Sequence, residues 1–281
     1  MNINAMGTIN KLNTANSQMK SSSSSIASGT RLNSAADDAS ALAIAMKMQS
    51  QIGGTNQAIR NATSGISLIQ IADGALGNTN AMVSRMKELS IQSANGIFGD
   101  TERGFMQLEI DQLMSEINRI SSTTNYNGIK LLDGSLSGNN SFNLQIGANN
   151  ASEQRLSINI NSMNANSIGL RGFNVSTVNG ALSSIGMSDS AISLVSGQRA
   201  SLGATQNRLE HTVNSLMTSN ENQIAALSRI SDADMAEEMI NYTKNSVLKQ
   251  TAIAMLAHQI REPQGMLSLL QQAAVPFNSR I

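Results

Sequence analysis

The chain has 281 residues, of which 40% are hydrophobic but only 2% aromatic, and its 19 basic and 19 acidic residues give a formal net charge of zero. This balance gives no reason to expect binding to nucleic acid or to an anionic membrane, and no run of about eighteen apolar residues predicts a membrane span. The lack of cysteine excludes disulfides, thiolate catalysis and cysteine metal sites.

The first 36 residues carry a narrow apolar stripe. Leu12, Met19 and Ile26 recur every seven residues, which is the spacing of one face of a helix. The run 21–25 consists of serine, which competes with the backbone for hydrogen bonds and weakens a helix. We therefore expect this segment to be disordered in the isolated subunit and helical only against a partner. The start of the chain has neither the basic nor the apolar region of a conventional signal peptide.

A glycine at position 29 breaks the stripe, and the next apolar pattern predicts a long helix from about residue 38 to 95. Its core positions alternate by three and four residues, with two polar steps: Ile59, Ala62, Ile66, Ile69, Asp73, Leu76, Asn80 and Val83. Asn95–Gly96 predicts a glycine C-cap for this helix. Asp100 or Thr101 then opens a shorter helix with a cleaner ladder: Met106, Ile110, Leu113, Ile117 and Ile120.

The period changes to two between about residues 129 and 160. Asn127–Gly128 predicts a tight turn before this region. Apolar residues then alternate with polar ones in two short runs: Phe142, Leu144 and Ile146, followed by Leu156, Ile158 and Ile160. This pattern predicts two half-buried strands joined by a loop.

Helical spacing resumes by about Leu182 and continues to Ile230, which predicts a helix roughly 60 Å long. Arg199 and Asn220 are among its polar steps. Ser231 and Asp234 have capping-box spacing, so a last helix should begin there. One face of that helix carries Met235, Met239, Tyr242, Ile253, Leu256 and Ile260, and we expect Pro263 to stop or kink it.

These elements predict a mainly α fold: a long antiparallel helical bundle or coiled coil with a small β-hairpin region as a minor α+β component, in which the N- and C-terminal halves pair. We predict a terminal coiled-coil domain from residues 1–36 and 235–281. Residues 37–234 form the predicted rod domain of long helices, with the hairpin region at about 128–165.

Nothing in the sequence predicts a catalytic, cofactor or metal site. His211 and His258 lie on separate predicted helices, and no HExxH motif is present. The acidic pairs at 37–38 and 232–234 stand at predicted helix starts, where carboxylates cap free N–H groups. The serine run could be a flexible linker, a sugar acceptor or a small-residue face that lets helices approach closely.

Five segments of the chain resemble those of bacterial flagellins, in the order of that family: residues 27–39, 61–70, 73–76, 86–96 and 230–239. Residues 262–270 also match the family's last segment, after which 271–281 run on. The N-terminal stripe is a few residues shorter and richer in serine than usual. The short middle suggests a flagellin with only the two inner domains.

The resemblance implies a structural subunit, not an enzyme, that self-assembles into the flagellar filament for motility after leaderless type III export, and that is therefore secreted and extracellular. The terminal stripes would order on assembly into the inner coiled-coil tube. Their assembly faces would be Leu12, Met19 and Ile26 together with Met239, Tyr242, Ile253, Leu256 and Ile260.

Implied partners are copies of the chain, the filament cap and junction proteins, and an export chaperone at residues 235–270. The animal Toll-like receptor for flagellin is a further implied partner, through Arg85, Leu89 and Glu109. The alternative within the flagellum is a hook–filament junction protein, which should match less well at residues 64–70 and 232–238 and have a more divergent middle. An enzyme or adhesin would need an inserted domain, and a cytoplasmic coiled-coil scaffold would have a stably helical monomer.

Overall fold

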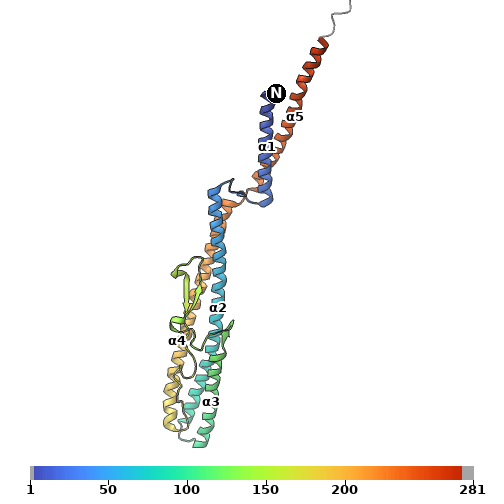
Figure 1. The fold of residues 1–281 in the computed structure, drawn as a ribbon. Coiled ribbons are helices and arrows are strands. Elements are labelled where there is room, and N and C mark those ends of the chain that lie inside the picture. Colours follow the sequence, from blue (N-terminus) through green and yellow to red (C-terminus); the bar gives the residue numbers. More distant parts are fainter. Residues whose placement is uncertain (1–2, 274–281) are drawn as a thin grey trace, which may run out of the picture. The chain divides into compact units, whose positions relative to one another are not determined.

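The computed structural model describes the backbone of residues 3–273, with side chains for 6–138, 140–261 and 265. The fold is mainly α, as predicted (Figure 1). The helices and strands follow in this order: α1 (Ile3–Ser28), α2 (Ala39–Ser93), α3 (Asp100–Thr123), β1 (Asn125–Tyr126), β2 (Ile129–Lys130), η1 (Gly138–Asn140), β3 (Phe142–Gln145), η2 (Ser152–Gln154), β4 (Arg155–Ile158), α4 (Val178–Ser231) and α5 (Met235–Ala273).

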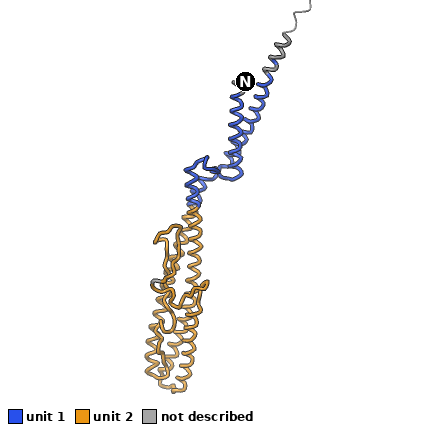
Figure 2. The backbone as a smooth tube through the Cα atoms, viewed as in Figure 1, with its two compact units in different colours: residues 1–49, 223–281 blue, residues 50–222 orange. Residues whose placement is uncertain are grey.

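The chain forms two compact units (Figure 2). Unit 1 contains residues 1–49 and 223–281, and unit 2 contains residues 50–222. By their residue numbers, α2 and α4 each contribute to both units. The predicted domain boundaries at 36/37 and 234/235 instead fall at the breaks between helices, and they remain a prediction about the assembled subunit.

Carboxylates cap two of the long helices at their N-termini, as the acidic pairs predicted. Asp38 Oδ1 accepts hydrogen bonds from the backbone N–H groups of Ser40 and Ala41 at 3.0 and 2.9 Å. Asp234 Oδ1 accepts the N–H groups of Ala236 and Glu237 at 2.9 and 3.2 Å. The predicted capping box at Ser231 is wrong, because α4 runs through Ser231 and Asp234 alone caps α5.

Two predicted helix ends are also corrected. Pro263 does not end α5, which continues to Ala273; a proline removes one backbone hydrogen bond, and the helix continues despite that loss. Helix α2 ends at Ser93, but Gly96 is not among the described glycines with positive φ, so the predicted glycine cap is absent. Arg103 of α3 instead donates from Nε to the Ser93 carbonyl oxygen at 3.0 Å and thereby satisfies a free helix end.

Within unit 2, α2 packs antiparallel to α4. Asn220 Nδ2 donates to Asn56 Oδ1 at 3.0 Å, and Lys87 Nζ lies 2.6 Å from Asp189 Oδ1, so residue numbers fall along α4 as they rise along α2. Between these contacts, Arg199 donates to both carboxylate oxygens of Asp73, from Nε at 2.8 Å and Nη2 at 3.2 Å. Asp73 on α2 and Arg199 on α4, one polar step of each predicted ladder, therefore face each other.

The hydrophobic core lies in unit 2. Its largest fully buried side chains come from α2, from α3 and from the segments between α3 and α4: Leu68, Ile69, Leu76, Met86, Ile110, Ile117, Leu131, Leu132, Ile158, Ile160, Ile168 and Leu170. Six of these stand on α2 and α3, and four of the six, Ile69, Leu76, Ile110 and Ile117, are predicted ladder positions. Apolar burial at this spacing explains why these helices form.

Two small antiparallel hairpins cover part of this core. β1 and β2 are joined by Asn127 and Gly128, whose positive φ angles of 49° and 81° fit the predicted two-residue turn. β3 pairs with β4, which confirms the two predicted strands, and the register places Leu144 opposite Leu156. Gly65 of α2 allows this hairpin to approach, because a Cβ there would lie 2.5 Å from Leu144 Cδ2.

Within unit 1, α1 and α5 run antiparallel and side by side (Figure 1). Thr8 Oγ1 donates to Gln259 Oε1 at 3.3 Å near one end of the pair. At the other end, Thr30 and Asp232 form an antiparallel bridge, and the Arg31 N–H donates to the Ser231 carbonyl at 2.7 Å. The partner that α1 requires is therefore present in its own chain, and disorder of α1 in the free subunit stays a prediction.

Candidate assembly and recognition surfaces

The inner seam of the α1/α5 pair is built from small and polar side chains. Among the described side chains of α1, the buried ones are Ala15, Ser22 and Ser25, so the serine run provides packing positions, as the resemblance to flagellins favours. Among the α5 side chains that the structure describes, the buried one is Asn245. These side chains remove little apolar area from water, so the seam contributes far less stabilisation per residue than a leucine or isoleucine seam would.

The predicted assembly residues divide between the two helices. Leu12, Met19 and Ile26 of α1 are half-buried, and so is Leu256 of α5. The other four predicted residues of α5 are exposed: Met239 at 52%, Tyr242 at 38%, Ile253 at 49% and Ile260 at 56%. Periodicity identified the apolar face of α5, but most of that face points away from α1.

Further apolar side chains of α5 are exposed on other sides of the helix. They are Ile240, Val247, Leu248 and Met255, which fall outside the single face that the apolar spacing predicted. A groove of about 540 Å³ runs along the pair and includes Leu248 and Met255. Large apolar surfaces of this kind mark sites of protein association.

Unit 2 carries the predicted receptor segment on α2 and α3. Arg85 Nε donates to Glu109 Oε1 at 2.9 Å, and Arg85 Nη1 lies 3.2 Å from Glu88 Oε2. The pKa of Arg85 is raised above its usual value, first because Glu109 and then because Glu88 accepts its hydrogen bonds. The structure thus brings Arg85 and Glu109 together on the surface, whereas Leu89 is 2% exposed and belongs to the core.

Exposed apolar residues lie beside this ion pair and were missed from the sequence. Ile91 of α2 and Phe105 and Leu108 of α3 are all more than half exposed. The pairs Arg85–Glu109 and Ser93–Arg103 bracket them, so Ile91 lies opposite Phe105 on adjacent antiparallel helices. The available signal was that Phe105 and Leu108 stand off the core ladder of α3.

The described residues contain little that suggests a catalytic or metal-binding site. No group of three or more histidine, cysteine or acidic side chains in the described part of the chain could hold a metal ion. His211 and His258 are both exposed and belong to different units. Among the described residues, every helix is too short or too polar to be a candidate membrane span.

Comparison with known proteins covers nearly the whole chain. Residues 1–137 match the family "Bacterial flagellin N-terminal helical region", and residues 185–270 match "Bacterial flagellin C-terminal helical region". The chain is 42% identical over 283 residues to the "Flagellar filament 33 kDa core protein" of Treponema phagedenis, covering 96% of this chain and 98% of that protein.

The chain is also similar to flagellins of two Bacillus species. The chain is 42% identical over 301 residues to a "Flagellin" of Bacillus subtilis (strain 168), with 96% of this chain and 98% of that protein covered. Among solved structures it is similar to the crystal structure of Bacillus cereus flagellin, at 29% identity and a TM-score of 0.50, covering 60% of this chain and 94% of that one.

Proposed function

The chain belongs to the bacterial flagellin family and is a structural subunit of the flagellar filament, and we propose that α1 and α5 make the contacts that join its copies. The exposed apolar face of α5 carries this proposal. Met239, Ile253 and Ile260 are each about half exposed in the single subunit although their side chains are large and apolar. Covering them with neighbouring subunits would provide a driving force for assembly.

The polar inner seam supports the same role. A helix pair held by alanine, serine and asparagine is marginal in isolation, which favours a terminal region that becomes fully ordered only when neighbours cover its outer face. Such a subunit would polymerise at a growing end and resist association elsewhere. We propose that the α1/α5 pair forms the inner coiled-coil tube of the filament. This pair corresponds to the predicted terminal domain of residues 1–36 and 235–281.

Seeded polymerisation tests this assignment. Purified Ile253→Asn subunits, mixed with filament fragments, should need a higher subunit concentration for growth than the parent. Ile253→Val keeps an apolar side chain and is the matched control, so it should polymerise nearly as the parent does. Equal growth of the Asn variant, with the unfolding of unit 2 unchanged, would show that the α5 face does not form subunit contacts.

The family is one of structural proteins, and we infer that this chain has no catalytic activity of its own. We place the subunit outside the cell, in the flagellar filament. The filament cap and the junction proteins are expected partners at the two ends of the assembly. An export chaperone is expected at residues 235–270, because the exposed apolar side chains of α5 would need to be covered before export.

A Toll-like receptor contact at Arg85 and Glu109 is a separate proposal. The exposed ion pair and the neighbouring apolar side chains Phe105 and Leu108 offer charged and apolar contacts on one surface. Arg85→Ala should weaken receptor signalling, whereas Arg119→Ala is the control, since Arg119 forms a similar exposed pair with Glu116. Parent-level signalling by Arg85→Ala would rule out the contact. Leu89 is unsuitable for this test because truncating a buried side chain would disturb the core.

The hook–filament junction protein is not favoured. The full-length relatives at about 40% identity carry the names flagellin or flagellar filament core protein. A filament subunit should propagate long filaments from seeds, and a junction protein should not. The polymerisation experiment therefore also separates these two functions.

A further inference from the structure

The sequence contains three Asn-Gly pairs, Asn95–Gly96, Asn127–Gly128 and Asn179–Gly180, and all of them lie in unit 2. In such a pair the glycine nitrogen can attack Cγ of the asparagine side chain, because glycine lacks a Cβ that would obstruct the approach. The new N–C bond closes a succinimide ring and ammonia leaves. Water then opens the ring to aspartate or isoaspartate. The surrounding structure determines how readily each pair reacts.

Asn95 is held in a conformation that suits this attack. Its Oδ1 accepts a hydrogen bond from the Ile97 N–H at 3.2 Å. The ring closed by this bond contains both Asn95 Cγ and Gly96 N, so the bond restricts the rotations that would separate the two reacting atoms. Negative charge that develops on Oδ1 during the attack already faces a donor, which is the arrangement of an oxyanion hole. Asn95 and Gly96 are exposed, so water and hydroxide have access.

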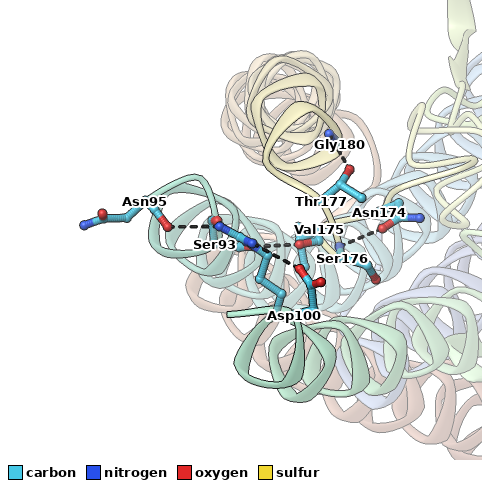
Figure 3. A network of polar contacts seen from close by, with 9 residues as sticks. Ser93, Asn95, Asp100, Asn174, Val175, Ser176, Thr177 and Gly180 are labelled. Atoms are coloured by element: carbon cyan, nitrogen blue, oxygen red, sulfur yellow. Dashed lines mark hydrogen bonds and ion pairs between the residues drawn. The ribbon is translucent and has the colours of Figure 1, made fainter. Parts of the chain in front are cut away.

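Arg103 assists the loss of the proton from the Gly96 nitrogen, which the attack also requires. Its Nη2 donates to the Asn95 carbonyl oxygen at 3.2 Å, while Nε is fixed on the Ser93 carbonyl and the residue is 7% exposed. The attack requires Gly96 to lose its N–H proton to water or hydroxide, and the resulting negative charge is shared with the Asn95 carbonyl oxygen. A buried cation bonded to that oxygen stabilises the anion. Arg103 Nη1 also lies 3.4 Å from Asp100 Oδ1. Figure 3 shows Ser93, Asn95 and Asp100, the three partners of Arg103.

The other two pairs lack this arrangement. Asn127 has a φ of 49° in the β1–β2 turn, and within the described part of the chain no hydrogen bond reaches its Oδ1. Gly180 lies in the first turn of α4, where its N–H donates to Thr177 Oγ1 at 3.1 Å, a contact seen in Figure 3. A nitrogen held by a hydrogen bond within a helix is less free to attack its neighbouring side chain.

We propose that Asn95–Gly96 is a self-modification site of the folded subunit, at which Arg103 and the Ile97 N–H promote succinimide formation. Ring opening at the former backbone carbonyl gives isoaspartate. The chain then runs through Cβ and Cγ, and the carbonyl that Arg103 holds becomes a carboxylate beside the guanidinium. Each modified subunit gains one negative charge in the connection between α2 and α3, so the modification marks the age of the subunit.

The native chain contains its own control. Asn95 and Asn127 are both followed by Gly-Ile, so their immediate chemistry is the same. Full-length subunits would be incubated at mildly alkaline pH, folded and in strong urea, and deamidation at each site measured by peptide mapping with mass spectrometry. In the folded chain we expect Asn95 to react at least about tenfold faster than Asn127, since one preorganised donor can change a rate by about a hundredfold. In urea the two rates should become equal.

The variant Arg103→Gln tests the effect of the arginine separately from that of the Ile97 N–H. Its rate at Asn95 should fall toward that at Asn127, while Asn127 keeps its native rate and thereby reports an intact fold. A faster reaction at Asn95 in this variant, with the Asn127 rate unchanged, would mean that Arg103 protects the turn and would overturn the proposal. Equal rates at Asn95 and Asn127 in the folded parent chain would also overturn it, and this comparison needs no variant.

Discussion

Both units contain helices with the same apolar periodicity, but the large apolar side chains are buried in unit 2 and mostly exposed in the described part of unit 1. All twelve of the largest fully buried side chains lie in unit 2, between Leu68 and Leu170. In the described part of unit 1, the buried side chains are small or polar except for Leu32: Ala15, Ser22, Ser25, Ala45 and Asn245. An apolar stripe therefore predicts a helix but does not say what the helix packs against.

The difference separates two tasks. Unit 2 buries its apolar area within one chain and so resembles an ordinary folded domain. The α1/α5 pair leaves much of its apolar area exposed, where a neighbouring subunit can cover it. We expect the stability of unit 2 to depend on the single chain, and that of the terminal pair to depend on assembly.

Amide hydrogen exchange should give the largest contrast between the two units. In free subunits we expect core amides of unit 2 to exchange roughly 10³ to 10⁶ times more slowly than unprotected ones, and amides of α1 and α5 to be nearly unprotected. Limited proteolysis should likewise remove roughly the first 35 and last 45 residues from free subunits but not from filaments. Equally slow exchange of both units in a dilute free subunit would erase the distinction.

Truncating one core side chain should give the next largest effect. Ile110 is fully buried, so Ile110→Ala should lower the free energy of unfolding by about 2–5 kcal/mol. Ile253→Ala removes the same atoms from a side chain that is 49% exposed and should change the stability of the free subunit little. Urea unfolding followed by circular dichroism measures both. A comparable loss in the two variants would show that α5 is as tightly packed as the core.

Sequence reasoning predicted the local elements of unit 2 well. The ladders of α2 and α3, the Asn127–Gly128 turn and the pairing of β3 with β4 all follow from spacing within one segment. The contact between Asp73 and Arg199 could not be predicted in this way, because it depends on the alignment of two helices distant in the chain. The helix end held by Arg103 was missed for another reason: Arg103 and Ser93 are only ten residues apart, but apolar spacing does not indicate which polar side chain will reach a free carbonyl.

The candidate surfaces were predicted only in part. Arg85 and Glu109 do meet, since their helices are joined by a short turn and run antiparallel. The ladder rule chose one apolar face of α5, but exposed residues such as Ile240 and Val247 lie outside that face. A hydrophobic period describes the residues on one side of a helix, whereas exposure depends on the neighbours that side meets.

The Asp73–Arg199 pair tests whether polar contacts add to the core of unit 2. Both side chains are about 40% exposed, so solvent screening should limit their coupling energy to about 0.5–1 kcal/mol. A double-mutant cycle with Asp73→Asn and Arg199→Gln, measured by urea unfolding, isolates this energy. Additive effects of the two substitutions would mean that the pair does not help to align α2 with α4.

Acid pH should give the smallest effect, and it concerns unit 2. The pKa of Asp133 is lowered, first by hydrogen bonds from the Ser135 hydroxyl and backbone N–H, the latter at 2.9 Å. Its folded pKa therefore lies below its unfolded value of about 3.9, so the group stabilises the fold above that pH and loses this contribution as the pH falls through the folded pKa. Asp133→Asn should make unfolding free energy less dependent on pH in this acid range, by a few tenths of a kcal/mol because Asp133 is exposed. Urea unfolding at mildly and strongly acidic pH measures the change, and an unaltered pH dependence would show that these hydrogen bonds do not stabilise the loop.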